Sequence, residues 1–364
     1  RRSSDLRPCG SSTRGTAGCS GRSRSTRSSR PSFAAEWSDG ARHSTFAWDT
    51  RAVVPLPERT PVRLVAAHLQ DDRSVVAAVQ SASFSVIRQT TATDLFGEEM
   101  RDTAIFDLTP ALPESITAVV ATAAEVFAGT ASGRIYRFRL VDLAAGGSEP
   151  AAVPEPAEIL PATNGSAVTA LGFLLGEVTL VAGGADGSVS TWFGVREQGL
   201  GNRFRPFRRI RELPPFPAAI TSIAASPRSK SFAVGDASGR AAVFHHTTGR
   251  TLATLDPSAE RPGEREPVRL LAFTPKSDGL IAVHGTRETA SGFAAVHYGV
   301  DIPHPEISPR ALFGKTWYEG YDRPGYVWQS TGGSDDFEGK FSFVPLLFGT
   351  VKGTFYALLF AVPI

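Results

Sequence analysis

Three stretches of the chain superpose without a gap: VFAGTASGRIYRF (residues 126–138), LVAGGADGSVSTW (residues 180–192) and FAVGDASGRAAVF (residues 232–244). They share glycine at two places and an aromatic residue at the end: Gly129, Gly133 and Phe138; Gly183, Gly187 and Trp192; Gly235, Gly239 and Phe244. The second glycine of each stretch predicts a hairpin turn, because glycine readily adopts the positive φ that such a turn needs. We expect the closing aromatic ring to pack between neighbouring sheets, where a large flat side chain covers the most surface.

The same unit repeats along most of the chain. Short starts rich in β-branched residues begin at Val62, Ile116, Val168, Ile220 and Val268, about 48 to 54 residues apart. This period lies in the range of propeller blades. The repeat resembles that of WD40-like propellers, although its terminal Trp-Asp pair is missing. We therefore predict an all-β fold, a WD40-like β-propeller with about five legible blades and an open blade number, followed by an aromatic connector and a truncated transmembrane α-helix.

Composition agrees with a turn-rich β protein and excludes several function classes. Of the 364 residues, 35 are glycine, 26 are proline and one is methionine, and the net charge of +2 argues against broad electrostatic binding to nucleic acid. The two cysteines, Cys9 and Cys19, lie near the N-terminus, so the body offers no disulfide and no cysteine metal site. We predict no enzyme activity, no catalytic residue, no cofactor and no metal.

Two groups of polar residues are candidate cation sites. His245 and His246 are adjacent, and consecutive side chains on a strand point to opposite faces, so we do not expect them to share an ion. Asp335, Asp336 and Glu338 could hold a cation, but a solvated loop just outside the membrane is the favoured interpretation.

Four segments follow from composition. Residues 1–45 are a basic tract that is disordered or artefactual, since its opening RRSSDL matches one frame of a sequencing adapter. Residues 46–303 hold the propeller, expected to be extracytoplasmic. Residues 304–340 form an aromatic juxtamembrane connector whose amphipathic rings fit a membrane interface: Trp317, Tyr318, Tyr321, Tyr326 and Trp328. Residues 341–364 carry one charge, Lys352, and are long enough to cross a bilayer.

The C-terminal part resembles a known family. In order, the chain has ALFGKTWY (residues 311–318), FSFVPLLFGT (341–350) and ALLFAVPI (357–364). This order resembles the entry to the second membrane helix of phosphate ABC-transporter permeases, in which a Pro-x-x-x-Gly-Thr opening and an Ala-Val-Pro close recur. The matching residues are Pro345, Gly349, Thr350, Ala361, Val362 and Pro363.

The resemblance implies an N-terminal fragment of an importer permease in a bacterial inner membrane, with the propeller inserted on the periplasmic side. Implied partners are a second permease subunit, an ATPase subunit, a periplasmic phosphate-binding protein and membrane lipid. The sequence leaves open an alternative, a periplasmic propeller scaffold held by a single C-terminal anchor. A quinone-dependent dehydrogenase propeller ranks third, because it would need a tryptophan docking motif in every blade.

Overall fold

A computed structural model describes residues 34–38, 41–45, 56, 60–69, 72–81, 83–93, 96, 99–145, 154–197, 204–255, 266–285, 293–300, 303–333 and 337–362. The chain divides into two units, Arg1–Pro55 and Leu56–Ile364. In the first unit, β1 (Ala34–Ser38) pairs antiparallel with β2 (Ala41–Thr45). This hairpin lies in residues 1–45, the tract predicted to be disordered or artefactual, and the remainder of that tract is outside the described residues.

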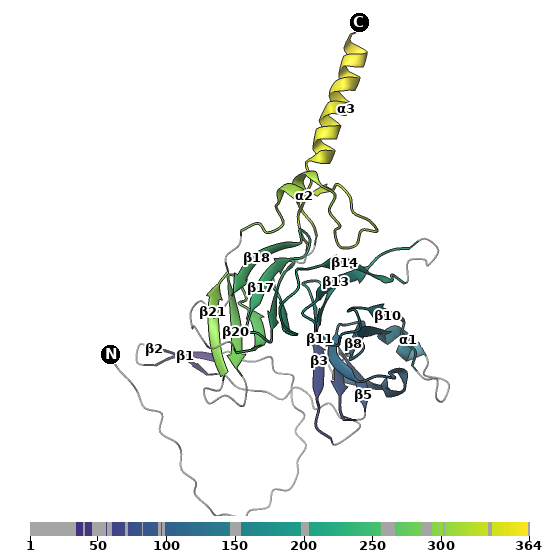
Figure 1. The fold of residues 1–364 in the computed structure, drawn as a ribbon, viewed down its shortest axis with the longest axis vertical. Coiled ribbons are helices and arrows are strands. Elements are labelled where there is room, and N and C mark those ends of the chain that lie inside the picture. The colour runs from purple at the N-terminus through teal and green to yellow at the C-terminus, as the bar shows by residue number, and fades with distance from the viewer. Residues whose placement is uncertain are drawn as a thin grey trace, which may run out of the picture. The chain divides into compact units, whose positions relative to one another are not determined.

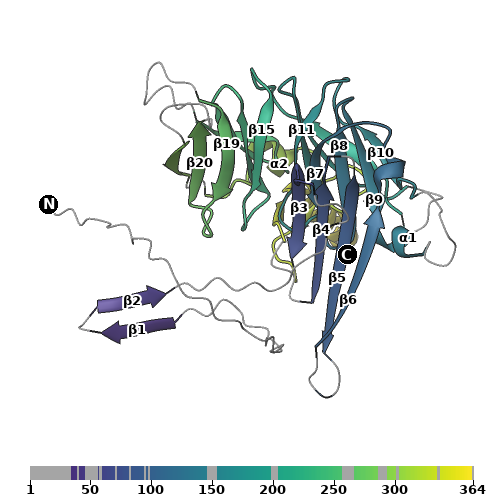
Figure 2. The ribbon, with the colours of Figure 1, turned by 90° about the horizontal axis from the view of Figure 1, so that it is seen from below.

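In the second unit, the described residues between Leu64 and Gly299 form five antiparallel sheets in chain order (Figure 2). Within each sheet, every strand pairs with the next one along the chain. The strands are β3 (Leu64–Leu69), β4 (Arg73–Val79), β5 (Phe84–Thr93) and β6 (Glu99–Asp107) in the first sheet; β7 (Ile116–Ala121), β8 (Glu125–Thr130), β9 (Arg134–Arg139) and β10 (Glu158–Pro161) in the second; β11 (Val168–Phe173), β12 (Thr179–Gly184), β13 (Val189–Gly194) and β14 (Phe207–Glu212) in the third; β15 (Ile220–Ala225), β16 (Ser231–Asp236), β17 (Ala241–His245) and β18 (Arg250–Leu255) in the fourth; and β19 (Val268–Phe273), β20 (Gly279–Gly285) and β21 (Phe293–Gly299) in the fifth. The predicted all-β propeller fold is confirmed.

The first strands of successive sheets lie side by side, β3 on β7, β7 on β11, β11 on β15 and β15 on β19 (Figure 2). Four of them begin at the residues predicted from the repeat, and the first begins at Leu64 instead of Val62. A short η1 (Thr109–Ala111) and α1 (Leu140–Ala145) flank the second sheet.

The repeated glycines have two physical causes. Gly133, Gly187 and Gly239 occupy the hairpin turns with φ of 84°, 79° and 87°, which other residues rarely adopt. The earlier glycine of each unit leaves room for the next sheet. A Cβ on Gly183 would lie 2.5 Å from Cγ2 of Ile220, the first residue of β15, and the equivalent atoms at Gly129 and Gly235 would meet Val168 and Val268. The repeat therefore encodes close contact between successive sheets.

Threonines beside these starts strengthen the same contact. The hydroxyl groups of Thr117 and Thr221 donate to the carbonyls of Val168 and Val268 at 2.6 Å, each reaching the sheet that follows. In the first sheet Arg63 takes this role, donating to the carbonyl of Ile116 at 3.0 Å. The divergent first repeat thus makes an equivalent bond with another side chain.

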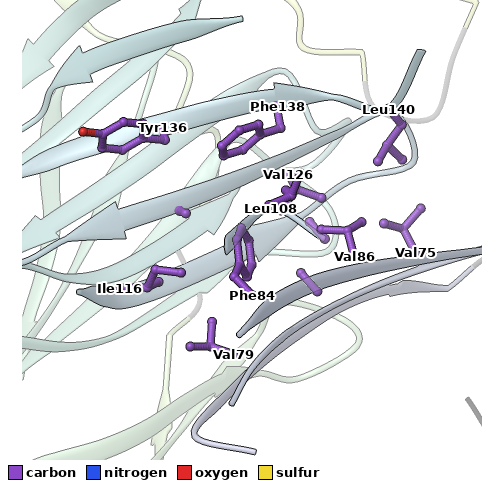
Figure 3. Close-up of a cluster of buried hydrophobic side chains, with 13 residues drawn as sticks. Val75, Val79, Phe84, Val86, Leu108, Ile116, Val126, Tyr136, Phe138 and Leu140 are labelled. Atoms are coloured by element: carbon purple, nitrogen blue, oxygen red, sulfur yellow. The ribbon is translucent and has the colours of Figure 1, made fainter. Parts of the chain in front are cut away.

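Apolar residues fill each interface between neighbouring sheets. Figure 3 shows the first of these clusters, where Phe84 and Phe138 meet edge to face with ring centroids 6.4 Å apart. The structure places Trp192 in the second interface and Phe244 in the third, each against the preceding sheet. The core is thus divided among the sheet interfaces.

After the fifth sheet the chain crosses back over earlier sheets. The segment contains α2 (Pro309–Phe313), β22 (Trp328–Gln329) and β23 (Lys340–Phe341), and it leads directly into α3 (Val344–Ala361). Figure 1 shows α3 projecting away from α2 with no other element beside it. The connector, predicted at residues 304–340, is taken in the structure as residues 303–343, the stretch between the fifth sheet and α3.

Candidate functional site: the connector and its helix

The helix α3 is long and apolar enough to cross a membrane, and it is the one such helix in the described part of the chain. Its 18 residues have a mean hydropathy of 1.5, and none of this span is buried within the molecule. At ~1.5 Å per residue the helix is about 27 Å long, close to the thickness of a bilayer's hydrocarbon core. An apolar surface of this kind needs lipid or another protein to cover it.

The permease-like residues fall on this helix. Pro345 lies in its first turn, where proline is well tolerated, and Ala361 is its last residue, followed by Val362 as the C-cap. The side chain of Thr350 donates to the carbonyl of Leu346 at 3.0 Å. A Cβ on Gly349 would meet nothing within 4 Å. Pro363 lies outside the described residues.

The connector docks on the third and fourth sheets through a buried ion pair. Nζ of Lys230, directly before β16, lies 2.6 Å from Oε2 of Glu319, and their side chains are only 4% and 14% exposed. Lys230 also donates to the carbonyl of Leu175 at 2.5 Å, and Thr179 donates to Glu319. A buried charge is stable only when paired and hydrogen-bonded in this way, so the contact fixes the connector's position.

A second contact joins the connector to the end of β17. Nε2 of His245 lies 2.9 Å from Oε1 of Glu338, and the hydroxyl of Thr247 donates to the same carboxylate. Nδ1 of His245 lies 2.9 Å from the hydroxyl of Thr248. The favoured interpretation of Glu338 as part of a solvated loop is therefore wrong, because its carboxylate is mostly buried against the propeller. Asp335 and Asp336 lie outside the described residues.

The neighbouring His246 is fully enclosed. Its ring meets Phe193 edge to face at 6.1 Å, and neither ring nitrogen has a hydrogen-bond partner among the described residues. Burial, helped by the charge of Arg211, holds the pKa of His246 well below its usual range. The side chain therefore acts as a neutral packing element beneath the connector.

The aromatic residues of the connector divide into two groups. Trp317 packs edge to face on Phe193 at 5.9 Å and donates to the carbonyl of Tyr321 at 2.8 Å. Tyr318 is buried, and burial, followed by the charge of Glu338, raises the pKa of its hydroxyl. Buried rings cannot lie among lipid headgroups, so Tyr318 serves packing. Among the rings predicted for the membrane interface, those of Tyr321, Tyr326 and Trp328 are exposed.

Stacked rings join the connector to α3. Trp328 stacks on Phe343, the N-cap of the helix, with centroids 5.8 Å apart, and Phe313 meets the same ring at 5.9 Å. The backbone NH of Phe343 donates to the carbonyl of Leu312 at 2.8 Å, and that of the buried Ser342 to Val327 at 2.9 Å. The N-cap of α3 and the residue before it are thus held by two arms of the connector, one at residues 312–313 and one at residues 327–328.

Among the residues that the structure describes, no group of three or more histidines, cysteines or carboxylates is arranged to hold a metal ion. The ion pairs of Lys230 and His245 were not found from sequence, because each joins residues far apart in the chain. One signal was present: Lys230 directly precedes the continuously buried strand β16, where a charge needs a partner.

Comparisons with known proteins find similar solved structures but no family. No family model and no curated protein matches the chain. The β-propeller domain of Cps50 (Swd1) from Myceliophteria thermophila is 15% identical, with a TM-score of 0.47, covering 68% of this chain and 72% of that one. The computationally designed protein Ika4 is 21% identical over 52% of this chain and 94% of its own, with a TM-score of 0.38. The designed Ika8 is 16% identical over 73% and 74%, with a TM-score of 0.40.

Proposed function

We propose that this chain is a membrane-held β-propeller interaction module, with the propeller on the extracytoplasmic, periplasmic side. The observation that carries the proposal is the continuous path from the propeller to α3. Lys230 and His245 hold the connector through Glu319 and Glu338, and the connector's stacked rings hold the start of the helix. A flexible tether would need none of these contacts. The propeller is therefore held in a fixed orientation relative to α3 when it meets its partners.

Membrane fractionation of the full chain and of a variant ending after Phe343 tests the anchor. We expect the full chain to stay in the membrane pellet after an alkaline carbonate wash and the shortened chain to be released. A shortened chain that still pellets, with its propeller folded by circular dichroism, would overturn the role of α3.

Cysteine labelling tests the side on which the propeller lies. The exposed turn residue Ala131 is replaced by cysteine after Cys9 and Cys19 are changed to serine, leaving a single thiol. We expect a membrane-impermeant maleimide to label this thiol in cells whose outer membrane is permeabilised. Labelling only after the inner membrane is broken would place the propeller in the cytoplasm.

The permease interpretation is the second candidate, favoured by the surface of α3. A helix with open space at both Gly349 and Gly353 offers the close backbone approach on which helix packing in membranes depends. In this proposal α3 packs against further membrane helices of a phosphate-type importer, and the propeller docks the periplasmic phosphate-binding protein. Replacing both glycines by leucine should abolish co-purification of a second permease subunit, and deleting residues 62–303 should abolish docking of the binding protein. Unchanged co-purification and docking would contradict this candidate.

A further inference from the structure

One face of the first sheet changes character along its length. The opposed pairs Val79 and Phe84, then Ala77 and Val86, pack against the second sheet. The next pair on the same face is Val75 and Arg88, and the pair after it is Arg73 and Thr90. Arginine thus occupies positions at which the alternation of side chains along the strands predicts buried apolar residues.

These arginines line a cavity of about 490 Å³ between the first two sheets, within the usual range of small-molecule sites. Its wall holds five arginines and one glutamate: Arg73, Arg88, Arg137, Arg139, Arg205 and Glu125. The cavity therefore has a strong excess of positive charge.

The wall contains paired guanidinium groups and free ones, which have no carboxylate partner among the described residues; one of the free groups, that of Arg88, lies 5.8 Å from the ring centroid of Phe106. Arg137 is neutralised by Glu125 at 2.6 Å and Glu158 at 3.1 Å, and Arg139 lies 3.5 Å from Asp142. Within the described ranges, Arg73, Arg88 and Arg205 have no carboxylate at ion-pair distance. Three free cations converging on one cavity repel one another unless an anion joins them.

We propose that this cavity binds a ligand through a phosphate group. The planar guanidinium groups of Arg73, Arg88 and Arg205 match the geometry of phosphate oxygens, with which arginine forms charge-assisted hydrogen bonds. The cavity lies at the start of β4 and the end of β9, which are the second and third strands of their sheets. In the third sheet, the equivalent strand ends contact the connector at Thr179 and Phe193, so the cavity lies on the connector side of the propeller. The phosphate can therefore belong to a soluble compound or to a lipid headgroup. This inference is independent of the permease and scaffold proposals.

The test uses the full chain in lipid nanodiscs and inorganic phosphate as the probe, followed by isothermal titration calorimetry. The variant R73Q/R88Q removes two free arginines, and the control R208Q/R228Q removes two exposed arginines outside the cavity. In discs of phosphatidylcholine we expect saturable phosphate binding, weakened at least about tenfold by R73Q/R88Q and less than about twofold by the control. Thermal unfolding checks that both variants stay folded.

Discs containing one fifth phosphatidylglycerol distinguish the two sources. Equal phosphate affinity in both discs assigns the site to a soluble compound. Weaker apparent affinity in the anionic discs, absent in R73Q/R88Q, assigns it to a headgroup that competes for the site. Absence of saturable binding in phosphatidylcholine discs, or equal weakening by the control, would overturn the proposal.

Discussion

Replacing Glu319 by glutamine should release the connector from the propeller. The variant leaves the ammonium group of Lys230 buried without a counter-charge, since its side chain is only 4% exposed. Breaking a buried pair from one side costs about 3–5 kcal/mol. Because Glu319 is 14% exposed, we take about 3 kcal/mol, a rise of roughly a hundredfold in the population of the undocked connector.

Native-state hydrogen exchange measures this opening directly. The amide of Thr316 donates to Gly325 and that of Tyr321 to Tyr318, both within the connector, so their exchange should accelerate while amides of β16 stay protected. The control is Glu306→Gln, since Glu306 pairs 3.2 Å from His304, whose side chain is 74% exposed, and such surface pairs contribute below about 1 kcal/mol.

A second variant identifies the cause of the effect. Adding Lys230→Met to Glu319→Gln removes the unpaired charge, so part of the protection should return. If Glu319→Gln changed exchange in the connector by less than about threefold, or no more than Glu306→Gln, the ion pair would not be what docks the connector.

Three further predictions concern the propeller. Gly183→Ala should lower the free energy of unfolding by about 1–3 kcal/mol in urea titrations because its Cβ would press on Ile220, whereas Gly299→Ala, in open space, should be nearly neutral; equal effects would contradict the contact. His246→Phe should raise the free energy of unfolding at pH 7, because it removes two buried ring nitrogens that make no hydrogen bond, and it should weaken the dependence of that free energy on pH. With the folded pKa of His246 depressed, the wild type loses stability as pH falls below about 6.5, by at most about 1.4 kcal/mol per pH unit, and an unchanged slope in His246→Phe would refute this origin. Thr221→Val should cost about 1 kcal/mol by removing the bond to Val268, measured against Thr331→Val on the exposed connector surface.

Local pattern was sufficient for most of the propeller. Hairpin glycines and alternating apolar residues act over a few positions, so the starts at Ile116, Val168, Ile220 and Val268 could be placed from sequence. The first start was displaced by two residues, to Leu64, in a repeat where Arg63 makes the bond that Thr117 and Thr221 make in later repeats.

The site depended on pairs distant in sequence. The local sequence placed Glu338 in a solvated loop and did not single out Glu319, because only the fold brings His245 and Lys230 to them. The aromatic residues of the connector were noticed, but a cluster of rings predicts burial and membrane contact equally well. Tyr318 packs inside and Trp328 lies exposed for reasons that belong to the docked geometry.

The docked connector also determines how mechanical load would travel through the molecule. A lateral pull on α3 passes through Phe343 to both arms of the connector and then to Lys230 and His245. These two contacts are short and polar, so they resist sliding until one breaks and then yield abruptly. The third and fourth sheets would bear the tension, and the first sheet, with its arginine-lined cavity, would be shielded from it.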